Sequence, residues 1–487
     1  MKIIANSLDI IATQVSGTFP DDILIEILSR LPVKSLMRFM SVCKHWRFFI
    51  KQNRHFIDLH FDRSKSRPNL LYINPMHEKG IYYLTALEEA FLKSQSLRQS
   101  ISWAEIVEGS GGGGGEEEVQ ALTSKDRITD DRWFLYNKVL EPVNGLVCFV
   151  DWNAYAIRVY NVSTRETTTW VKSTLLAEEN DKLENEDSRV QITSLRKPIY
   201  QIGFDPEKRE CKVFCLWRLI ARRQRLITSS TDRPDYVCWE AFTVGCDTKW
   251  RRINAVPNEC NQIKIKQVFP PDNNRRRQLY ANGTLYWSNK EYSSDLRRCS
   301  NPDDPSVIVA FDVGSEKYRV IPIPDFILEE RRHVSSLFDY KLPIAMLVLG
   351  AHVALIFRME RNVVKLWMLD DGGVDKKLEN CRGNKSNWST ETITLPFYGD
   401  NWIDGVGVAG SSDKILFECL GCKDKVKFHC LYSFDLRKKS YKKIEMDGVS
   451  SFTHYSNRSL VTTFTESLYH VQPLNKRSFV SPSLEVM

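Results

Sequence analysis

The sequence contains a glycine-rich stretch whose spacing could bind a dinucleotide. Residues 405–410, Gly-Val-Gly-Val-Ala-Gly, match the pattern G-x-G-x-x-G. That pattern binds a pyrophosphate only where a strand precedes it and a helix follows, because the helix N-terminus attracts the phosphate charge. The residues that follow here, Lys414 to Cys419, predict a strand instead. We therefore interpret these glycines as allowing strands to pack closely, and not as a nucleotide site.

A second stretch contains four residues that are common zinc ligands, Cys419, Cys422, His429 and Cys430. Zinc in a structural site takes four thiolate or imidazole ligands arranged as a tetrahedron. His429 and Cys430 are neighbours, so in a strand their side chains point to opposite faces and do not easily reach one metal ion. We expect ordinary strand residues and no metal here, and elemental analysis of the protein should find no stoichiometric zinc.

No other arrangement of residues in the sequence predicts catalysis. The run Gly111–Gly115 is followed by Glu116–Glu118 and not by Gly-Lys-Ser/Thr, so it predicts a flexible loop that does not bind phosphate. No Ser/His/Asp, Cys/His or paired-carboxylate combination stands out. The basic clusters Arg222–Arg225 and Arg275–Arg277 are interpreted as solvated loops, with a patch for nuclear import or for an acidic substrate as the alternative. We expect no catalytic residue and no cofactor.

The composition is that of an ordinary globular protein in a reducing compartment. Hydrophobic residues make up 42% and charged residues 26% of the 487 residues. The net charge of +7 is small for this length, so nucleic acid binding is not expected. The twelve cysteines are scattered and do not form a disulfide framework. The longest apolar run, Leu342–Phe357, contains Pro343 and Gly350 and predicts two strands, not a membrane span. We expect a cytoplasmic or nuclear protein.

A compact helical module is expected near the N-terminus. Pro20 followed by Asp21 and Asp22 is typical of a helix start, and Pro32 ends the helix because proline has no N–H and clashes with the preceding turn. Apolar residues recur at helical spacing before and after Pro32. They are Ile23, Leu24, Ile27, Leu28 and Leu31 in a first helix, and Leu36, Met37, Phe39, Met40, Val42, Cys43, Trp46, Phe49 and Ile50 in a second helical pattern. A module this small cannot bury all of them, so the surplus faces either the rest of the chain or a partner.

From about Asn69 the pattern changes to short strands that form a degenerate repeat. Each unit has an apolar strand, a turn and a second strand, usually followed by a charged turn and an aromatic residue. The second strands are Ile157–Asn161, Trp239–Thr243, Val309–Val313, Val364–Met368 and Leu431–Asp435. This recurrence favours a large all-β domain, a β-propeller of about six four-stranded blades, over tandem two-sheet sandwiches. The acidic stretch Glu178–Ser188 is interpreted as a loop.

The helical stretch carries a specific motif. Phe19–Asp22, the break at Leu31–Pro32 and Val42–Trp46 follow one another in the order and spacing of the F-box, so residues 19–46 resemble that family. The remainder resembles the plant F-box-associated domain, a kelch-like family. The residues that carry this second resemblance are Asn144–Cys148, Tyr160–Arg165, Ile202–Pro206, Cys211–Val213, Asn282–Trp287 and Lys365–Leu369.

The two resemblances imply a substrate-recognition subunit of an SCF-type ubiquitin ligase. The F-box would dock a SKP-family adaptor, and through it cullin and RING subunits, while the β domain would bind a protein substrate that the sequence does not name. An adaptor-binding scaffold that degrades nothing, and a sugar-processing propeller enzyme, are the alternatives. The adaptor-binding residues implied by the resemblance are Phe19, Pro20, Ile23, Leu24, Ile27, Leu28, Leu31, Pro32, Leu36, Phe39, Val42, Cys43 and Trp46.

The domain organisation follows from these patterns. We predict a disordered tail at 1–15, the F-box at 16–60, a linker at 61–68, the propeller-like domain at 69–475 with flexible insertions at 86–130 and 176–198, and a tail at 476–487. The helical period stops near residue 56 and strands begin near residue 69, so we expect the two parts to have separate cores. Strands near residues 69–84 could close the propeller.

Overall fold

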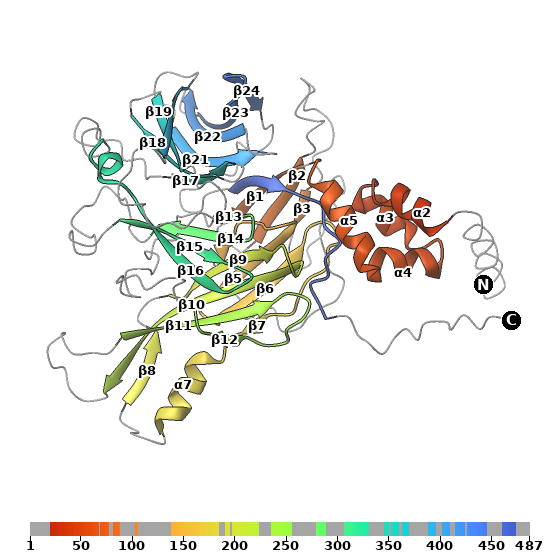
Figure 1. Cartoon of the computed structure of the whole chain (residues 1–487), viewed down its shortest axis with the longest axis horizontal. Coiled ribbons are helices and arrows are strands. Elements are labelled where there is room, and N and C mark those ends of the chain that lie inside the picture. Colours follow the sequence, from red (N-terminus) through yellow and green to blue (C-terminus); the bar gives the residue numbers. More distant parts are fainter. Residues whose placement is uncertain are drawn as a thin grey trace.

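The computed structural model describes residues 20–67, 69–76, 81–87, 103–105, 138–184, 190–194, 197–223, 235–255, 279–288, 306–330, 345–349, 352–359, 363–369, 388–395, 402–409, 414–423, 426–445 and 460–473. Helices come first in the chain and lie beside a large β domain (Figure 1). They are α2 (Asp21–Leu28), α3 (Val33–Phe39), α4 (Lys44–Gln52) and α5 (Arg54–Ser64). The predicted order of a small all-α module followed by a large all-β domain is confirmed.

The helix ends lie where local chemistry requires them. Pro20 occupies the N-cap position of α2, close to the predicted helix start. Pro32 was expected to end this helix, but α2 already ends at Leu28, and Pro32 instead occupies the N-cap position of α3. The single second helical pattern of the sequence is in fact two helices. Cys43 interrupts it with an extended backbone, and its Sγ accepts a hydrogen bond from Trp46 N at 3.4 Å, which caps α4. Asn53 caps α5 in the same way, accepting from Phe56 N at 3.0 Å.

The described strands form six antiparallel sheets (Figure 1). The strands are β1 (Asn69–Met76), β2 (Ile81–Leu87), β3 (Trp103–Glu105), β4 (Lys138–Val139), β5 (Leu146–Asp151), β6 (Ala156–Asn161), β7 (Val171–Lys172), β8 (Val190–Ser194), β9 (Ile199–Asp205), β10 (Glu210–Arg223), β11 (Asp235–Thr243), β12 (Arg251–Ile253), β13 (Leu279–Ala281), β14 (Thr284–Ser288), β15 (Val307–Asp312), β16 (Lys317–Pro322), β17 (Ala345–Leu349), β18 (His352–Arg358), β19 (Val363–Leu369), β20 (Trp388–Thr394), β21 (Trp402–Ala409), β22 (Lys414–Lys423), β23 (Val426–Asp435), β24 (Ser440–Glu445) and β25 (Leu460–Phe464). Four sheets each use consecutive strands, β4–β7, β13–β16, β17–β20 and β21–β24. In a fifth sheet, β8, β9 and β11 all pair with β10, and β12 pairs with β11. The predicted number of blades stays a prediction.

The sixth sheet joins the two ends of the β domain. The C-terminal strand β25 pairs with the N-terminal strand β1, with Leu71 opposite Thr462 and Ile73 opposite Leu460. The strands β2 and β3 complete the sheet in the order β25-β1-β2-β3. The expectation that strands near residues 69–84 close the domain is therefore confirmed. Closure in this way removes two strand edges that would otherwise carry unpaired backbone groups.

The repeat recognised in the sequence corresponds to equivalent strands. The five recurring segments lie on β6, β11, β15, β19 and β23, each next to the last strand of its sheet.

Several strands end in Asp or Asn whose side-chain oxygen accepts a hydrogen bond from the backbone two or three residues further on, which is an Asx turn. The turns begin at Asp151, Asn161, Asp205, Asp312 and Asp435. Four residues later the backbone φ is positive in each case, at Tyr155, Arg165, Arg209, Glu316 and Lys439.

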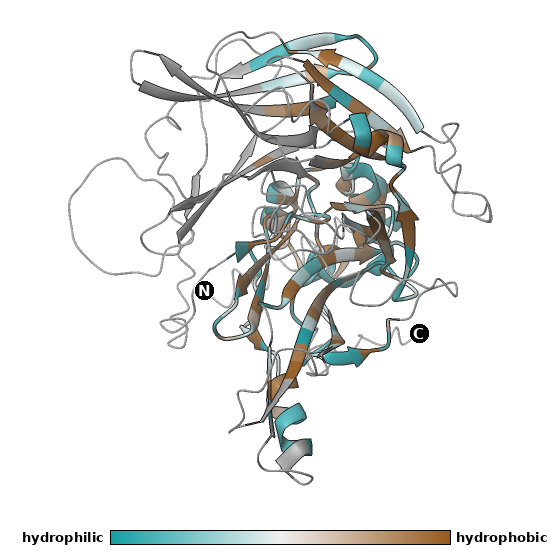
Figure 2. Ribbon diagram, turned by 90° about the vertical axis from the view of Figure 1, so that its left-hand side faces the viewer, coloured by the Kyte–Doolittle hydropathy of each residue, from teal (hydrophilic) through white to brown (hydrophobic). Residues whose placement is uncertain are grey.

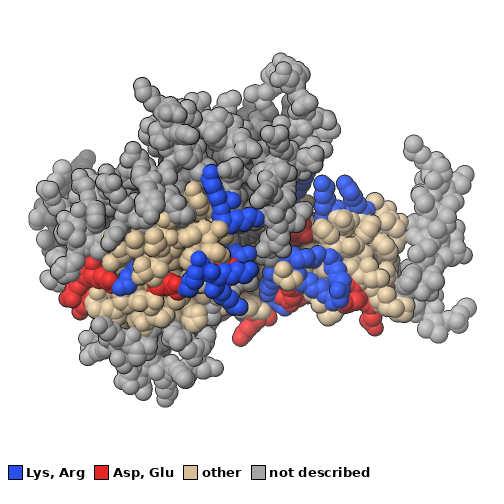
Figure 3. All heavy atoms as spheres, turned by 90° about the horizontal axis from the view of Figure 1, so that it is seen from above, with Lys and Arg blue, Asp and Glu red and all other residues tan. Residues whose placement is uncertain are grey.

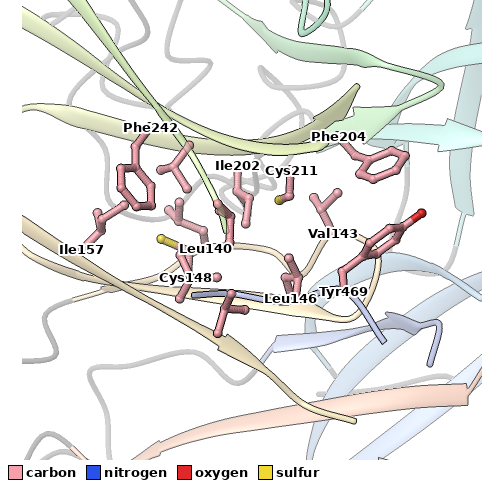
Figure 4. Close-up of a cluster of buried hydrophobic side chains, with 14 of the residues drawn as sticks. Leu140, Val143, Leu146, Cys148, Ile157, Ile202, Phe204, Cys211, Phe242 and Tyr469 are labelled. Carbon is pink, nitrogen blue, oxygen red and sulfur yellow. The ribbon is translucent and has the colours of Figure 1, made fainter. Parts of the chain in front are cut away.

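Side chains alternate along the strands, so neighbouring sheets share apolar cores. The strand ribbons in Figure 2 carry hydrophobic and hydrophilic bands in turn. Figure 4 shows the cluster between the sheets of β5 and β9, where Cys148 and Ile157 face Ile202 and Phe242. Tyr469, from the segment after β25, enters this cluster beside Phe204.

The helices belong to the same cluster, so the expectation of separate cores is wrong. Leu28, Val33 and Phe61 are part of one buried group with Phe204 and Tyr469 of the β domain. The physical reason is that α5 continues to Ser64, beyond the point at which the helical period of the sequence stops. Its Phe61 ring lies 5.9 Å from the ring of Phe204 and 5.1 Å from that of Tyr469.

The acidic stretch expected as a loop contains a helix, α7 (Leu175–Glu184), so that interpretation is wrong. Leu175 is fully buried, and its N–H donates to Ser173 Oγ at 3.2 Å. Asn180 joins the helix to β8 because its amide accepts from Ile192 N at 2.7 Å and donates to Ile192 O at 3.0 Å. Both α7 and β8 lie at the edge of the β domain farthest from α2–α5 in Figure 1. These tertiary contacts outweigh the loop-like composition.

The stretches considered for chemistry lie on strands. Gly405 belongs to β21, and the strand predicted from Lys414 onward is β22, so no helix follows the glycines. The absence of a dinucleotide site stays a prediction. The register places Cys419 opposite Cys430, and His429 opposite Leu420. The absence of a metal stays a prediction.

Other predictions about segments have mixed outcomes. The apolar run around residue 350 forms the hairpin of β17 and β18, as expected. Arg222 and Arg223, expected in a loop, pair with β8 instead, and residues 275–277 lie outside the described part of the chain. None of the described helices is long and apolar enough to cross a membrane.

Candidate functional site

The large apolar side chains that are exposed within the described residues all lie on the helical module. They are Ile23 (45% exposed), Ile27 (52%), Val42 (48%) and Phe48 (50%). We refer to them as the four exposed apolar residues. Water contact of this kind is unfavourable, and exposed apolar surface that gathers on one part of a protein is typical of a binding surface.

The four exposed apolar residues lie on α2, on α4 and in the turn between α3 and α4. Ile23 and Ile27 are one turn apart, so they share a face of α2, whereas Leu24 and Leu28 lie on the buried side. His45 Nε2 lies 3.2 Å from Asp21 Oδ1, a contact that holds the first turns of α4 and α2 together. Val42 precedes His45 by three residues and Phe48 follows it by three, so both lie near this contact. In the sequence, Val42 and Phe48 therefore flank the contact that joins α4 to α2.

The structure separates the residues that the sequence proposed for partner binding. Those that are exposed are Pro20, Ile23, Ile27, Pro32 and Val42. Those that are partly buried are Leu31, Phe39, Cys43 and Trp46. Leu24, Leu28 and Leu36 are buried and contribute to the interior, and Phe19 lies outside the described residues.

Sequence reasoning missed Phe48. It assigned Phe49 and Ile50 to the apolar stripe of α4, and these two residues are indeed buried. Phe48 falls outside that stripe and is half exposed, and its ring lies in a T-shaped arrangement with the Phe49 ring, at 6.3 Å between centroids. The sequence did contain a signal for Phe48. It is an aromatic residue outside an apolar stripe that is already complete, so its side chain is expected at the surface, where a large apolar group can bind a partner.

The helical module also exposes charged residues. Lys34 and Arg38 are exposed on α3, and Arg47 is exposed on α4. On α2, hydrogen bonds from Arg63 and then Arg30 lower the pKa of Glu26, so this carboxylate stays charged. Figure 3 shows further Lys and Arg side chains where the helices meet the β domain.

A set of polar contacts fixes the helical module on the β domain. Arg209, in the turn between β9 and β10, donates two hydrogen bonds to Asp62 of α5, at 2.9 and 2.6 Å. These bonds lower the pKa of Asp62 to about 2. Arg54 donates to the backbone carbonyls of Lys208 and Arg209 at 3.1 and 2.6 Å. A bidentate arginine contact has a defined geometry, so these bonds favour one orientation of the helical module on the β domain.

His60 is a buried titratable group within this module. Its side chain is fully buried and its Nε2 lies 3.0 Å from the carbonyl oxygen of Leu31. Because a carbonyl only accepts, Nε2 must carry the proton of the neutral ring. Burial lowers the pKa of His60 to about 4, against an effect of the Leu31 hydrogen bond that raises it. The histidine is therefore neutral in the folded protein at physiological pH.

Acid should weaken the fold through His60. Its pKa is about 4 in the folded chain, below the ordinary value of 6.5, so the unfolded chain binds more protons between these pH values. The stability present above pH 6.5 is lost as the pH falls toward 4, by about 2 kcal/mol between pH 7 and pH 5. Urea unfolding at both pH values measures this loss, and the variant H60Q should show a smaller one. An equal loss in both chains would assign the effect to other groups.

The pH dependence of stability due to His470 has the opposite sign to that due to His60, and the variant H60Q removes only the contribution of His60. Burial lowers the pKa of His470, but the hydrogen bonds to Glu166 and to the Lys51 carbonyl together raise it above its ordinary value. The stability contributed by His470 is therefore complete at low pH and is lost as the pH rises through its folded pKa.

Comparison with known proteins gives two family matches. The model of the "F-box associated beta propeller domain" matches residues 115–468, and that of the "F-box domain" matches residues 18–58. The first match covers more than half of the chain. Neither description names a kelch repeat, so the kelch-like detail of the resemblance stays a prediction.

Individual relatives span nearly the whole chain. The F-box protein At5g65850 of Arabidopsis thaliana is 24% identical over 471 residues, which cover 95% of this chain and 92% of that protein. The F-box protein At4g19940 of the same plant is 26% identical over 445 residues, 88% of this chain and 86% of that protein. Among solved structures, a nidogen/laminin complex aligns with 82% of this chain and 99% of its own at 10% identity, and its TM-score of 0.35 supports no inference.

Proposed function

Because the chain belongs to the F-box proteins with an F-box-associated β-propeller domain, we propose that it is a substrate-recognition subunit of an SCF-type ubiquitin ligase. The observation that carries this proposal is the location of the four exposed apolar residues in the helical F-box module, on α2, on α4 and in the turn before α4. In this reading the F-box docks a SKP-family adaptor, and through it cullin and RING subunits. The propeller domain binds the protein to be ubiquitinated.

Docking would follow the helix-in-groove mode of recognition. The four exposed apolar residues lose water on contact with the adaptor, a gain of about 25 cal/mol for each Å² of apolar surface. The partly buried Phe39 and Trp46 rings, 5.4 Å apart in an edge arrangement, would extend this surface. Lys34, Arg38 and Arg47 would form its polar rim.

The contribution to ubiquitin transfer would be positional and not catalytic. A substrate held on the propeller is kept near the ubiquitin-charged enzyme, which raises its effective concentration. The contacts of Arg209 with Asp62 and of Arg54 with the β9–β10 turn support this role, because they remove free rotation between F-box and propeller. The compartment we propose is the cytosol or the nucleus.

Reconstitution with purified adaptor, cullin and RING subunits tests the proposal. The chain should co-purify with the adaptor in a one-to-one complex. Proteins captured by proximity labelling in cells with a blocked proteasome should then receive ubiquitin from the reconstituted ligase only when the chain is present. A chain that does not bind the adaptor would refute the proposal. Stable binding without transfer to any captured protein would instead favour a scaffold that degrades nothing.

A further inference from the structure

The residues that follow the last strand cross from the β domain to the F-box. We call residues 465–473 the C-terminal strap. The strap has no strand of its own, yet Leu468, Tyr469 and Val471 are 3%, 8% and 1% exposed and belong to the shared core. A segment without regular structure can be this buried only if its backbone groups find other partners.

On the side of the β domain, the strap is held by the turn after β6. Asn161 Nδ2 donates to the carbonyls of Ser467 and Tyr469 at 3.1 and 2.9 Å, and Ser467 N donates to Ser163 Oγ at 3.0 Å. The strap also passes very close to Gly145. A Cβ atom there would be 2.5 Å from the Thr465 carbonyl oxygen, and φ is +80°. Only glycine tolerates both conditions, so the β domain is shaped to receive the strap.

On the side of the F-box, the strap supplies groups that the helices need. Glu466 Oε2 accepts from Val33 N at 3.1 Å, which is one of the N–H groups at the start of α3 that have no partner within the helix. His470 Nε2 donates to Lys51 O at 2.6 Å, a carbonyl of the last turn of α4. The strap therefore caps α3 at its beginning and α4 at its end, and the carboxylate of Glu466 also suits the positive end of α3.

The strap also packs against α5. The Tyr469 ring lies 5.1 Å from Phe61, and its hydroxyl donates to Asp58 Oδ1 at 3.0 Å. All three helices are thus contacted by residues that are more than 400 positions away in the sequence. The strap reaches them because β25, which immediately precedes it, pairs with β1, the strand that follows α5.

We propose that the C-terminal strap is a structural part of the F-box. In this arrangement the contacts that cap and pack α3, α4 and α5 are complete only when β25, the last strand, has paired with β1 and closed the propeller. Adaptor docking is therefore coupled to completion of the β domain. A chain with an open or truncated propeller presents an F-box that is only partly ordered. Only the fraction of molecules with an ordered F-box can bind the adaptor, so the apparent affinity falls in proportion to that fraction. This inference rests on the proposed function.

Two truncated chains and a pair of point variants test the coupling. The first chain ends at Phe464, which removes the strap and keeps β25, and its matched control ends at Pro473, which keeps the strap. The point variants are Y469A and its conservative partner Y469F, which retains the ring that contacts Phe61 and Phe204. Amide hydrogen exchange in α3–α5 is measured on each chain without adaptor, and adaptor affinity is measured by calorimetry.

Loss of the strap should accelerate exchange in α3–α5 and weaken adaptor binding by about tenfold or more, as expected when helix caps and packing are removed. Y469A should behave in the same direction, whereas the chain ending at Pro473 and Y469F should stay within about threefold of the full chain. Unchanged exchange and affinity in the chain ending at Phe464 would overturn the proposal. If that chain does not fold, the contrast between Y469A and Y469F decides, and equal behaviour of these two overturns it. A full chain that fails to bind the adaptor refutes the proposed function, while the exchange data still decide the coupling.

Discussion

The double variant I23D/I27D is expected to lose adaptor binding and to keep its fold. Both side chains are about half exposed, so the new carboxylates remain hydrated in the free protein. In the complex they would be buried without a partner, at a cost of roughly 3–5 kcal/mol for an unpaired charge. The affinity should fall by about 100- to 1000-fold or more. Calorimetric titration with the purified adaptor measures this loss, and circular dichroism checks that the helices persist.

A neighbouring substitution provides the control. Leu28 is next to Ile27 in the sequence but is only 3% exposed. L28D would bury the charge inside the free protein, so it should lower the stability of the fold by several kcal/mol even without adaptor. Adaptor affinity within about threefold of normal in I23D/I27D would show that the exposed face of α2 is not the docking surface.

The double variant also makes a better competitor than a chain without its N-terminus. Deleting the helices would uncover Phe204 and Tyr469, which are now buried against Phe61. The full-length double variant keeps this interface, and under the proposed function it should still bind the substrate. Expressed in excess, it should compete with the normal receptor and lengthen the half-life of the substrate.

The sequence predicted the local features of the helices but not which faces are buried. Pro20 and the apolar spacing act within one or two turns, so the start of α2 could be derived from them, whereas its end at Leu28 comes one turn before the Pro32 that was expected to end it. The assignment of Ile27 to the surface and Leu28 to the interior depends on partners that are distant in the sequence. Among these are α5 and the C-terminal strap, which belong to the same core.

In the β domain, too, features set by neighbouring residues could be predicted from the sequence, and features set by distant residues could not. The repeat could be recognised partly because three of its five recurring segments end in the same local structure, an Asx turn, at Asn161, Asp312 and Asp435. The helix α7 could not be recognised from the sequence, because the partners of its acidic residues come from distant parts of the fold. Glu179 accepts a hydrogen bond from Tyr236 at 2.8 Å and forms an ion pair with Arg252 at 2.6 Å. Composition alone gives no information about such partners.

The variant F61A is expected to destabilise the whole protein and not only the F-box. Phe61 is fully buried, and its ring contacts Phe204 of β9 and Tyr469 of the strap. Removing a buried phenylalanine costs about 3–5 kcal/mol, a large part of the 5–15 kcal/mol that stabilise a typical domain. Because the F-box and the propeller share this core, the loss should appear in the unfolding of both.

Urea unfolding followed by tryptophan fluorescence measures this effect, because buried tryptophans such as Trp217 and Trp239 report on the propeller. The unfolding midpoint of F61A should move to a lower urea concentration. F48A is the matched control, since it removes the same ring from the same module at a side chain that is 50% exposed. It should change the stability by less than about 1 kcal/mol and yet weaken adaptor binding. If the fluorescence midpoint of F61A stayed in place, the F-box would unfold on its own, and the contacts of Phe61 with Phe204 and Tyr469 would not couple the two parts.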